Sequence, residues 1–102
     1  MTNSRFFALH HLAAALVHTL DSCSYANERD IGFGSDVANL FYRANEVKER
    51  DLEEALRLVN EAKEFLDTDY GKMLEARLSF EVGAVIEAIC NVCDELLKRN
   101  GV

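Results

Sequence analysis

Three histidines near the start of the chain are the first side chains that could bind a metal ion. Two histidines on a helix share one ion when they stand four residues apart, because that spacing turns both rings to one face. His11 and His18 share a face, but they are seven residues apart, roughly 10 Å along a helix axis. The spacing therefore favours packed or interface histidines, and we expect no bound metal and no cofactor.

Three cysteines, Cys23, Cys90 and Cys93, could support redox or zinc chemistry. A zinc site would need a fourth ligand, and His18 points well away from Cys23 on the helical wheel. Free cysteine usually behaves as a small buried hydrophobe. An odd count without framework spacing is not typical of a disulfide-stabilised secreted domain. We expect reduced, packed cysteines, and whether they come together depends on the path of the helices.

Arg5 and His10 have four residues between them, a spacing that resembles the catalytic pair of the helical HEPN ribonucleases. In that family a polar residue follows the arginine and the motif lies toward the end of the domain. Here Phe6 follows Arg5, and the pair opens the chain. Because the resemblance covers two residues only, we expect no ribonuclease site.

Two pairs of glutamates have a spacing that resembles the magnesium-binding pairs of helical nucleotide pyrophosphatases. Basic residues surround both pairs, and no matching facing pair occurs in the sequence. Such mixed charges are typical of a solvated helix face with salt bridges. The pairs are Glu46 with Glu49, and Glu61 with Glu64. With no assembled catalytic group, we expect that the protein is not an enzyme.

The composition limits the class of protein further. The 102 residues include 18 acidic and 11 basic side chains, a formal net charge of −7. Such a charge repels phosphate backbones, so we expect no direct nucleic acid binding. The apolar stretch from Phe6 to Leu20 lacks a basic lead and a cleavage site, and it is too short to span a bilayer comfortably. We therefore expect a cytoplasmic protein without a membrane segment.

The pattern of apolar residues predicts an all-α fold. Proline is absent and glycine occurs 5 times, so almost nothing forbids helix. We expect one helical domain over residues 1–102, a small antiparallel bundle of three long or four to five shorter helices. The expected elements are a helix from Asn3 or Ser4 to about Cys23 or Tyr25, a loop over 24–34, a helix capped by Ser35, a helix start at Asp51 with Glu54, a cap at 67–69, and a last helical region from about Tyr70 to Arg99.

Two architectures fit these elements. In the first, residues 35–66 and 69–99 form one long hairpin, the first helix runs parallel to the last, and Cys23 comes near the other two cysteines. In the second, the chain breaks near Arg50 and near Gly83 into shorter helices. A faint repeat at an offset of 33 residues favours the second, and residues 51–56 resemble the start of the second helix of a tetratricopeptide unit.

The first helix carries the main functional signal. Its buried seam is expected to comprise Phe6, Leu9, Ala13, Leu16, Leu20 and Cys23. The opposite face lacks full charges, although a surface helix normally carries them there. That face comprises Phe7, His11, Ala14, Ala15, His18 and Ser22. We expect it to be covered, either because the helix is central or by a second copy; solvent exposure of His11, Ala15 and His18 in a lone subunit would remove the support for association.

Phe33, between Gly32 and Gly34, is a possible anchor at the tip of the predicted loop, or a ring that seals the end of the bundle. Together these features predict a non-catalytic helical protein–protein interaction module, homodimeric through the first helix. The alternative is a small acidic inhibitor or immunity-type protein that blocks a basic target protein by charge complementarity.

Overall fold

The computed structural model describes residues 2–78 and 80–101, which form five helices and no strand. The helices are α1 (Thr2–Ser22), α2 (Glu28–Val47), α3 (Leu52–Leu66), α4 (Asp69–Arg77) and α5 (Phe80–Arg99). The all-α class is confirmed, with the larger number of shorter helices.

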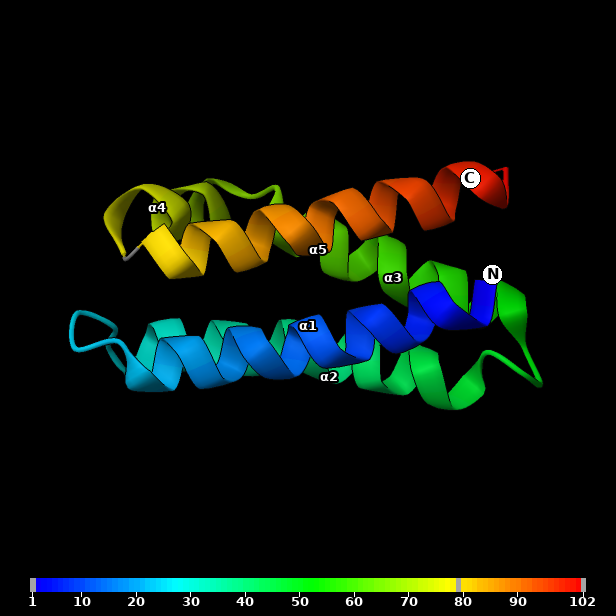
Figure 1. Ribbon diagram of the computed structural model, residues 1–102, viewed down its shortest axis with the longest axis horizontal. Helices are drawn as coiled ribbons and strands as arrows, with labels where there is room; N and C mark the ends of the chain where they lie inside the picture. The colour runs from blue at the N-terminus through cyan, green and yellow to red at the C-terminus, as the bar shows by residue number, and fades with distance from the viewer. Residues whose placement is uncertain (1, 79, 102) are drawn as a thin grey trace.

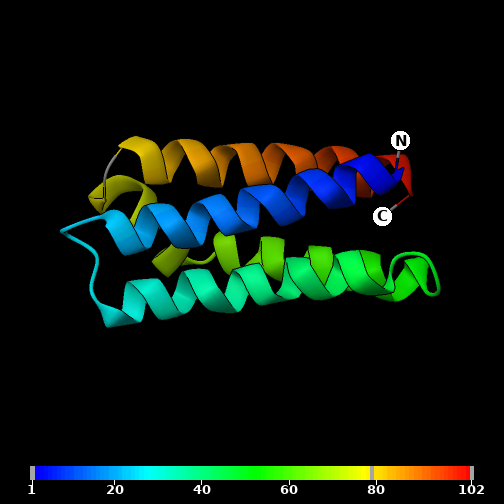
Figure 2. The same cartoon turned by 60° about the horizontal axis from the view of Figure 1, so that its bottom comes forward.

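Four of the helices run alternately up and down the long axis of the molecule (Figure 1). α1 packs against α2 and α5, and α3 packs against the same two helices, so that α1 and α3 occupy opposite corners of a four-helix bundle. Figure 2 shows α1 between α2 and α5. The short α4 lies in the connection from α3 to α5, at the end of the bundle where α1 finishes. α1 is therefore antiparallel to α5, and the long-hairpin architecture is wrong.

The break between α2 and α3 falls where the second architecture placed it. Asp51 caps α3, and its side chain accepts a hydrogen bond from the backbone N–H of Glu54. Thr68 caps α4 in the same way by accepting from the N–H of Gly71. The predicted break near Gly83 is wrong, because Gly83 lies inside α5 and the chain leaves the helical conformation at Leu78.

The predicted loop over 24–34 is also wrong, since α2 begins at Glu28. Asn27 caps it, and the side chains of Asn27 and Asp30 each accept from the other residue's backbone N–H, a reciprocal capping box. Gly34 lies inside the helix, where α1 comes close: a Cβ there would be 2.3 Å from Cδ1 of Leu20. Gly34 thus serves helix packing and not a turn, and Phe33 is on a helix.

The core lies between the four long helices. The predicted seam of α1 is buried from Phe6 to Leu20, with each side chain at most 1% exposed, whereas Cys23 is half-buried. Apolar side chains of the other helices complete the core. None of the helices in the described ranges is both long and apolar enough to cross a membrane.

A pair of glycine substitutions tests this packing. Gly71→Ala places a methyl group 2.4 Å from the carbonyl oxygen of Leu66, a backbone atom that cannot move away independently. We expect a loss of about 1–3 kcal/mol in the free energy of unfolding. Gly32→Ala, inside α2 with nothing within 4 Å of the new methyl, should stabilise the protein by about 0.5–1 kcal/mol.

Urea denaturation followed by far-ultraviolet circular dichroism measures both free energies. Equal effects of the two substitutions would contradict the close approach of α4 to the end of α3.

Candidate functional site

The charge-free face of α1 points outward from its corner of the bundle. Phe7, Ala14 and Ser22 are exposed together with both histidines of the face, and Ala15 is half-buried. The first helix is therefore not the covered centre of the domain. His11 and His18 are exposed and Ala15 is half-buried in the lone subunit, so the uncharged face of α1 by itself no longer supports association. An interface is also exposed in a single chain when its partner is absent. Whether this face is an interface must therefore be judged from the size and chemistry of the surface around it.

The side of α5 next to α1 continues this charge-free surface. Two observations give the register of the antiparallel pair: Arg5 forms an ion pair with Glu95, and Thr19 and Glu81 line the same hollow. Between Glu81 and Glu95, this side of α5 carries uncharged residues that are exposed or half-buried. They are Ala84, Val85, Ala88, Asn91 and Val92.

Glu87, also between these two glutamates, belongs to the other side of α5. It is seven residues before Asp94, and residues at that spacing share a helix face. Asp94 forms an ion pair with Lys63 of α3. Glu87 therefore lies on the α3 side, and the α1 side of α5 stays free of charge between Glu81 and Glu95.

The side of α2 next to α1 is uncharged between Glu28 and Glu46, two exposed glutamates on the same face. The ring of His10 lies 4.8 Å from the ring of Tyr42, measured between centroids, so Tyr42 marks the α1 side of α2. Ser35 stands seven residues earlier on the same face, and both side chains are half-buried. Asp36 lies in a hollow with Phe65 and Thr68 of the α3–α4 region, on the other side.

We call this region the uncharged surface: the outer face of α1 (Phe7, His11, Ala14, Ala15, His18, Ser22) with the adjoining sides of α5 and α2. Charged residues bound it at both ends. The Arg5–Glu95 pair and Glu46 of α2 lie at one end, and Asp21 and Glu81 lie at the other. Within it, the Phe7 ring packs edge to face on the His11 ring, with 4.5 Å between centroids.

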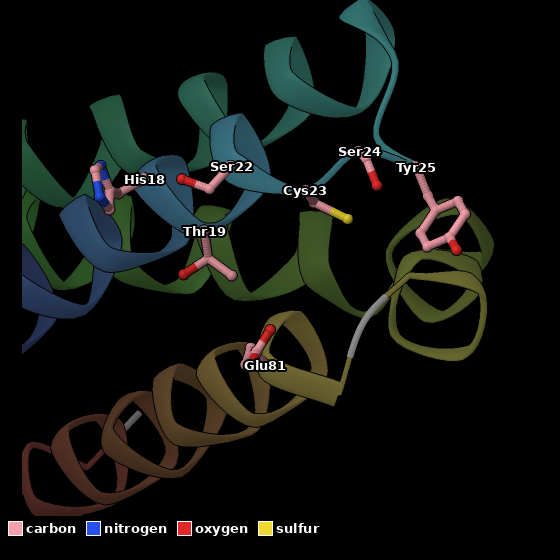
Figure 3. A pocket seen from close by; sticks show the side chains of 7 residues that line it. All are labelled: His18, Thr19, Ser22, Cys23, Ser24, Tyr25 and Glu81. Atoms are coloured by element: carbon pink, nitrogen blue, oxygen red, sulfur yellow. The ribbon is translucent and has the colours of Figure 1, made fainter.

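At the α1 C-terminal end, the uncharged surface leads into an open polar hollow of about 390 Å³ between α1, the following loop and α5 (Figure 3). His18, Thr19, Cys23, Tyr25 and Glu81 line it together with two serines. In Figure 3 the Glu81 side chain points toward Thr19, and the Cys23 thiol lies on the other side of the hollow, by the loop. The described residues bring no three His, Cys, Asp or Glu side chains together as a metal site.

The cysteines do not come together. Cys23 is at the end of the bundle where α5 begins, whereas Cys90 and Cys93 are nine and twelve residues beyond Glu81. They therefore lie roughly 13 and 18 Å farther along the α5 axis. No disulfide links the three cysteines.

Arg5 and His10 project to opposite flanks of α1. Arg5 reaches Glu95 of α5, while His10 packs on Tyr42 of α2. Five helical positions turn the side-chain direction by about 140°. The two side chains therefore form no ribonuclease-like pair within one chain.

The glutamates of α3 belong to local surface interactions. Glu61 forms an ion pair with Arg57 at 3.4 Å, and Glu64 accepts a hydrogen bond from the Asn60 amide at 3.2 Å. Arg57 also pairs with Glu54. These contacts follow the expected helix spacing of a solvated charged face.

A buried polar contact, which the sequence reasoning missed, joins α2 to α4. Asp30 is fully buried, and its carboxylate accepts hydrogen bonds from the Tyr70 hydroxyl and the Asn27 backbone N–H. The Tyr70 ring also packs on Phe33, with 5.0 Å between centroids, and under the guanidinium of Arg29. Phe33 thus helps to close this end of the bundle. The Asn-x-x-Asp capping pattern was the sequence signal for this site.

No family model matches the chain, and neither the curated proteins nor the solved structures contain a match.

Tyr70→Phe tests the buried contact. The substitution removes the hydroxyl that donates to the Asp30 carboxylate, and we expect a loss of about 1–3 kcal/mol in the free energy of unfolding. Tyr25→Phe is the matched control, because Tyr25 is 76% exposed. Urea denaturation gives both free energies, and a neutral Tyr70→Phe substitution would contradict the role of the contact.

The thiols differ in predicted reactivity. Burial raises the pKa of the Cys93 thiol, which keeps it protonated and shielded, while Cys23 is half-buried beside the open hollow. At pH 8, iodoacetamide should modify Cys23 at least about tenfold faster than Cys93 in the folded protein. Peptide mass spectrometry measures the two rates, and urea should abolish the difference. Equal rates without urea would mean that Cys93 is accessible.

Proposed function

We propose that the protein is a non-catalytic helical interaction module that forms a homodimer through the uncharged surface. The observation that carries this proposal is the continuity of that surface across α5, α1 and α2, well beyond the six residues of the α1 face. Scattered uncharged residues are common on monomers, but the absence of charge over a continuous surface resembles the charge depletion found at interface cores, which supports an interaction site.

The dimensions of the bundle suit such an interface. The Cα envelope measures 39 × 20 × 18 Å. One whole side therefore presents on the order of 800 Å², the area that each partner of a standard protein interface buries. The uncharged surface, about 22 Å long from Phe7 to Ser22, forms the central half of that side. Phe7 is 58% exposed at its rim, and aromatic side chains of this kind are enriched at interfaces.

Charge restricts where a second copy of the chain can bind. Each chain carries a formal net charge of −7, so two copies repel each other wherever their charged sides meet. The uncharged surface is where two copies can approach with the least repulsion. It also removes few charges from water, which keeps the cost of desolvation low. A basic partner would instead favour the acidic sides.

The alternative function, a small acidic inhibitor of a basic target protein, stays a prediction. It would use the carboxylates outside the uncharged surface, so its binding to a basic protein would weaken as salt rises. Homodimerisation through the uncharged surface would depend little on salt. Three cysteines without a disulfide fit a reducing, cytoplasmic setting for either function.

Ala14→Glu tests the dimer. Two new carboxylates, one from each chain, would enter the centre of the interface, and we expect the dimer dissociation constant to rise at least about 100-fold. Ala76→Glu is the matched control, since Ala76 is exposed on α4, away from the uncharged surface. Sedimentation equilibrium at several concentrations measures the dissociation constants.

The control should dimerise like the unaltered chain. A monomeric unaltered chain at several hundred micromolar, or an Ala14→Glu chain that dimerises normally, would overturn the proposal.

A further inference from the structure

The two exposed histidines of α1 are placed symmetrically about the middle of its outer face. His11 comes three residues before Ala14, and His18 comes three residues after Ala15. Each therefore lies roughly 5 Å along the helix axis from the point between the alanines. Within one chain the two rings are too far apart to share an ion, as the sequence already indicated.

A second copy of the chain supplies the second histidine that each ring needs to share an ion. In a symmetric dimer whose two α1 helices cross antiparallel, a two-fold axis between Ala14 and Ala15 places His11 opposite the partner's His18. The same operation places His18 opposite the partner's His11. The contact thus contains two identical histidine pairs, one on each side of the axis.

We propose, on the basis of the homodimer proposed above, that each of these cross-chain histidine pairs binds a divalent ion of the zinc class. Neutral imidazole nitrogens are ligands that Zn²⁺ prefers, and water completes the coordination where the protein offers two ligands. The metal joins one chain to the other, so it strengthens the dimer. No ligand comes from a charged group of the interface.

The small residues at the centre allow the close approach that the pairs need. In the α1–α5 register, Arg5 is level with Glu95 and Thr19 is level with Glu81. Ala14 and Ala15 therefore lie level with Val85 of α5. Exposed Ala84 flanks Val85. Helices that meet at small side chains approach to about 8 Å between axes. At that separation, histidine side chains on both sides of the crossing reach a common ion.

Charge favours the antiparallel over the parallel orientation. A parallel pair would place the Asp21 and Glu81 ends of both chains together. An antiparallel pair separates them and brings each toward the end of the partner where Arg5 and Arg99 both pair with Glu95. The helix dipoles also oppose each other favourably in this orientation.

The surroundings of the two histidines suit a cation. Asp21 follows His18 by three residues, and Glu81 lines the same hollow as His18. Around His11 the neighbouring rings are Phe7 and His10, which carry no negative charge. The carboxylates near His18 therefore lower the free energy of a bound cation.

The test measures dimerisation of the full chain by sedimentation velocity at pH 7.5, in ZnCl₂ and in EDTA. We expect Zn²⁺ to lower the dimer dissociation constant at least tenfold, with two ions per dimer. His11→Ala and His18→Ala should each abolish this effect, because neither homodimer retains a complete pair. Circular dichroism confirms that these exposed substitutions leave the fold intact.

An equimolar mixture of the two variants is the decisive arm. A mixed dimer joins His18 of the His11→Ala chain to His11 of the His18→Ala chain, so it restores one complete pair. We expect the mixture to regain zinc-dependent dimerisation with one ion per mixed dimer. His10→Ala, on the flank toward α2, and Cys23→Ser, beside His18 in the hollow, are controls that should keep the full effect.

The outcomes separate this inference from the dimer itself. Dimers of equal strength in ZnCl₂ and EDTA would overturn the metal site and leave the dimer standing. A chain that is monomeric in both solutions would overturn both. A mixture that responds no better than the single variants would overturn the antiparallel pairing. A zinc effect that survives His11→Ala but not Cys23→Ser would place the ion within one chain and overturn the cross-chain pair.

Discussion

The bundle depends on the packing of the α1 seam between α2 and α5. Phe6, Leu9, Leu16 and Leu20 are buried, and Gly34 of α2 lets the second helix come close enough to contact Leu20 directly. A seam of this kind uses one face of a helix only. Because α1 is held at a corner by two neighbours, its opposite face must point outward, and that face is the one without charge.

The uncharged face of α1 supports a functional role only when it is considered together with the neighbouring helices. A lone uncharged helix face tolerates water when it consists of alanine, serine and histidine. Here the neighbouring sides of α5 and α2 are uncharged at the same level, while Glu87 and Asp36 lie on the sides away from α1. The uncharged sides of the three helices therefore lie next to one another and form one surface, as expected where a protein binds a partner.

The far end of the bundle is held by polar contacts. The buried Asp30 carboxylate binds both the start of α2 and the Tyr70 hydroxyl of α4, and a buried carboxylate of this kind must be hydrogen-bonded to be tolerated. The contact fixes the short α4 across the end, and it is separate from the outer face of α1.

The sequence by itself determined the features that depend on interactions between residues close together in the chain. The helical period identified the buried seam of α1, and local side-chain caps identified the starts at Asp51 and Thr68. It did not place the start of α2, because Gly32 and Gly34 are turn formers locally and only the approach of Leu20 explains a glycine there. It also left open the break at Leu78 and the direction of α1 against α5. Only the tertiary structure decided those, and with them the separation of the cysteines and the uncharged surface, because such contacts join residues far apart in the chain.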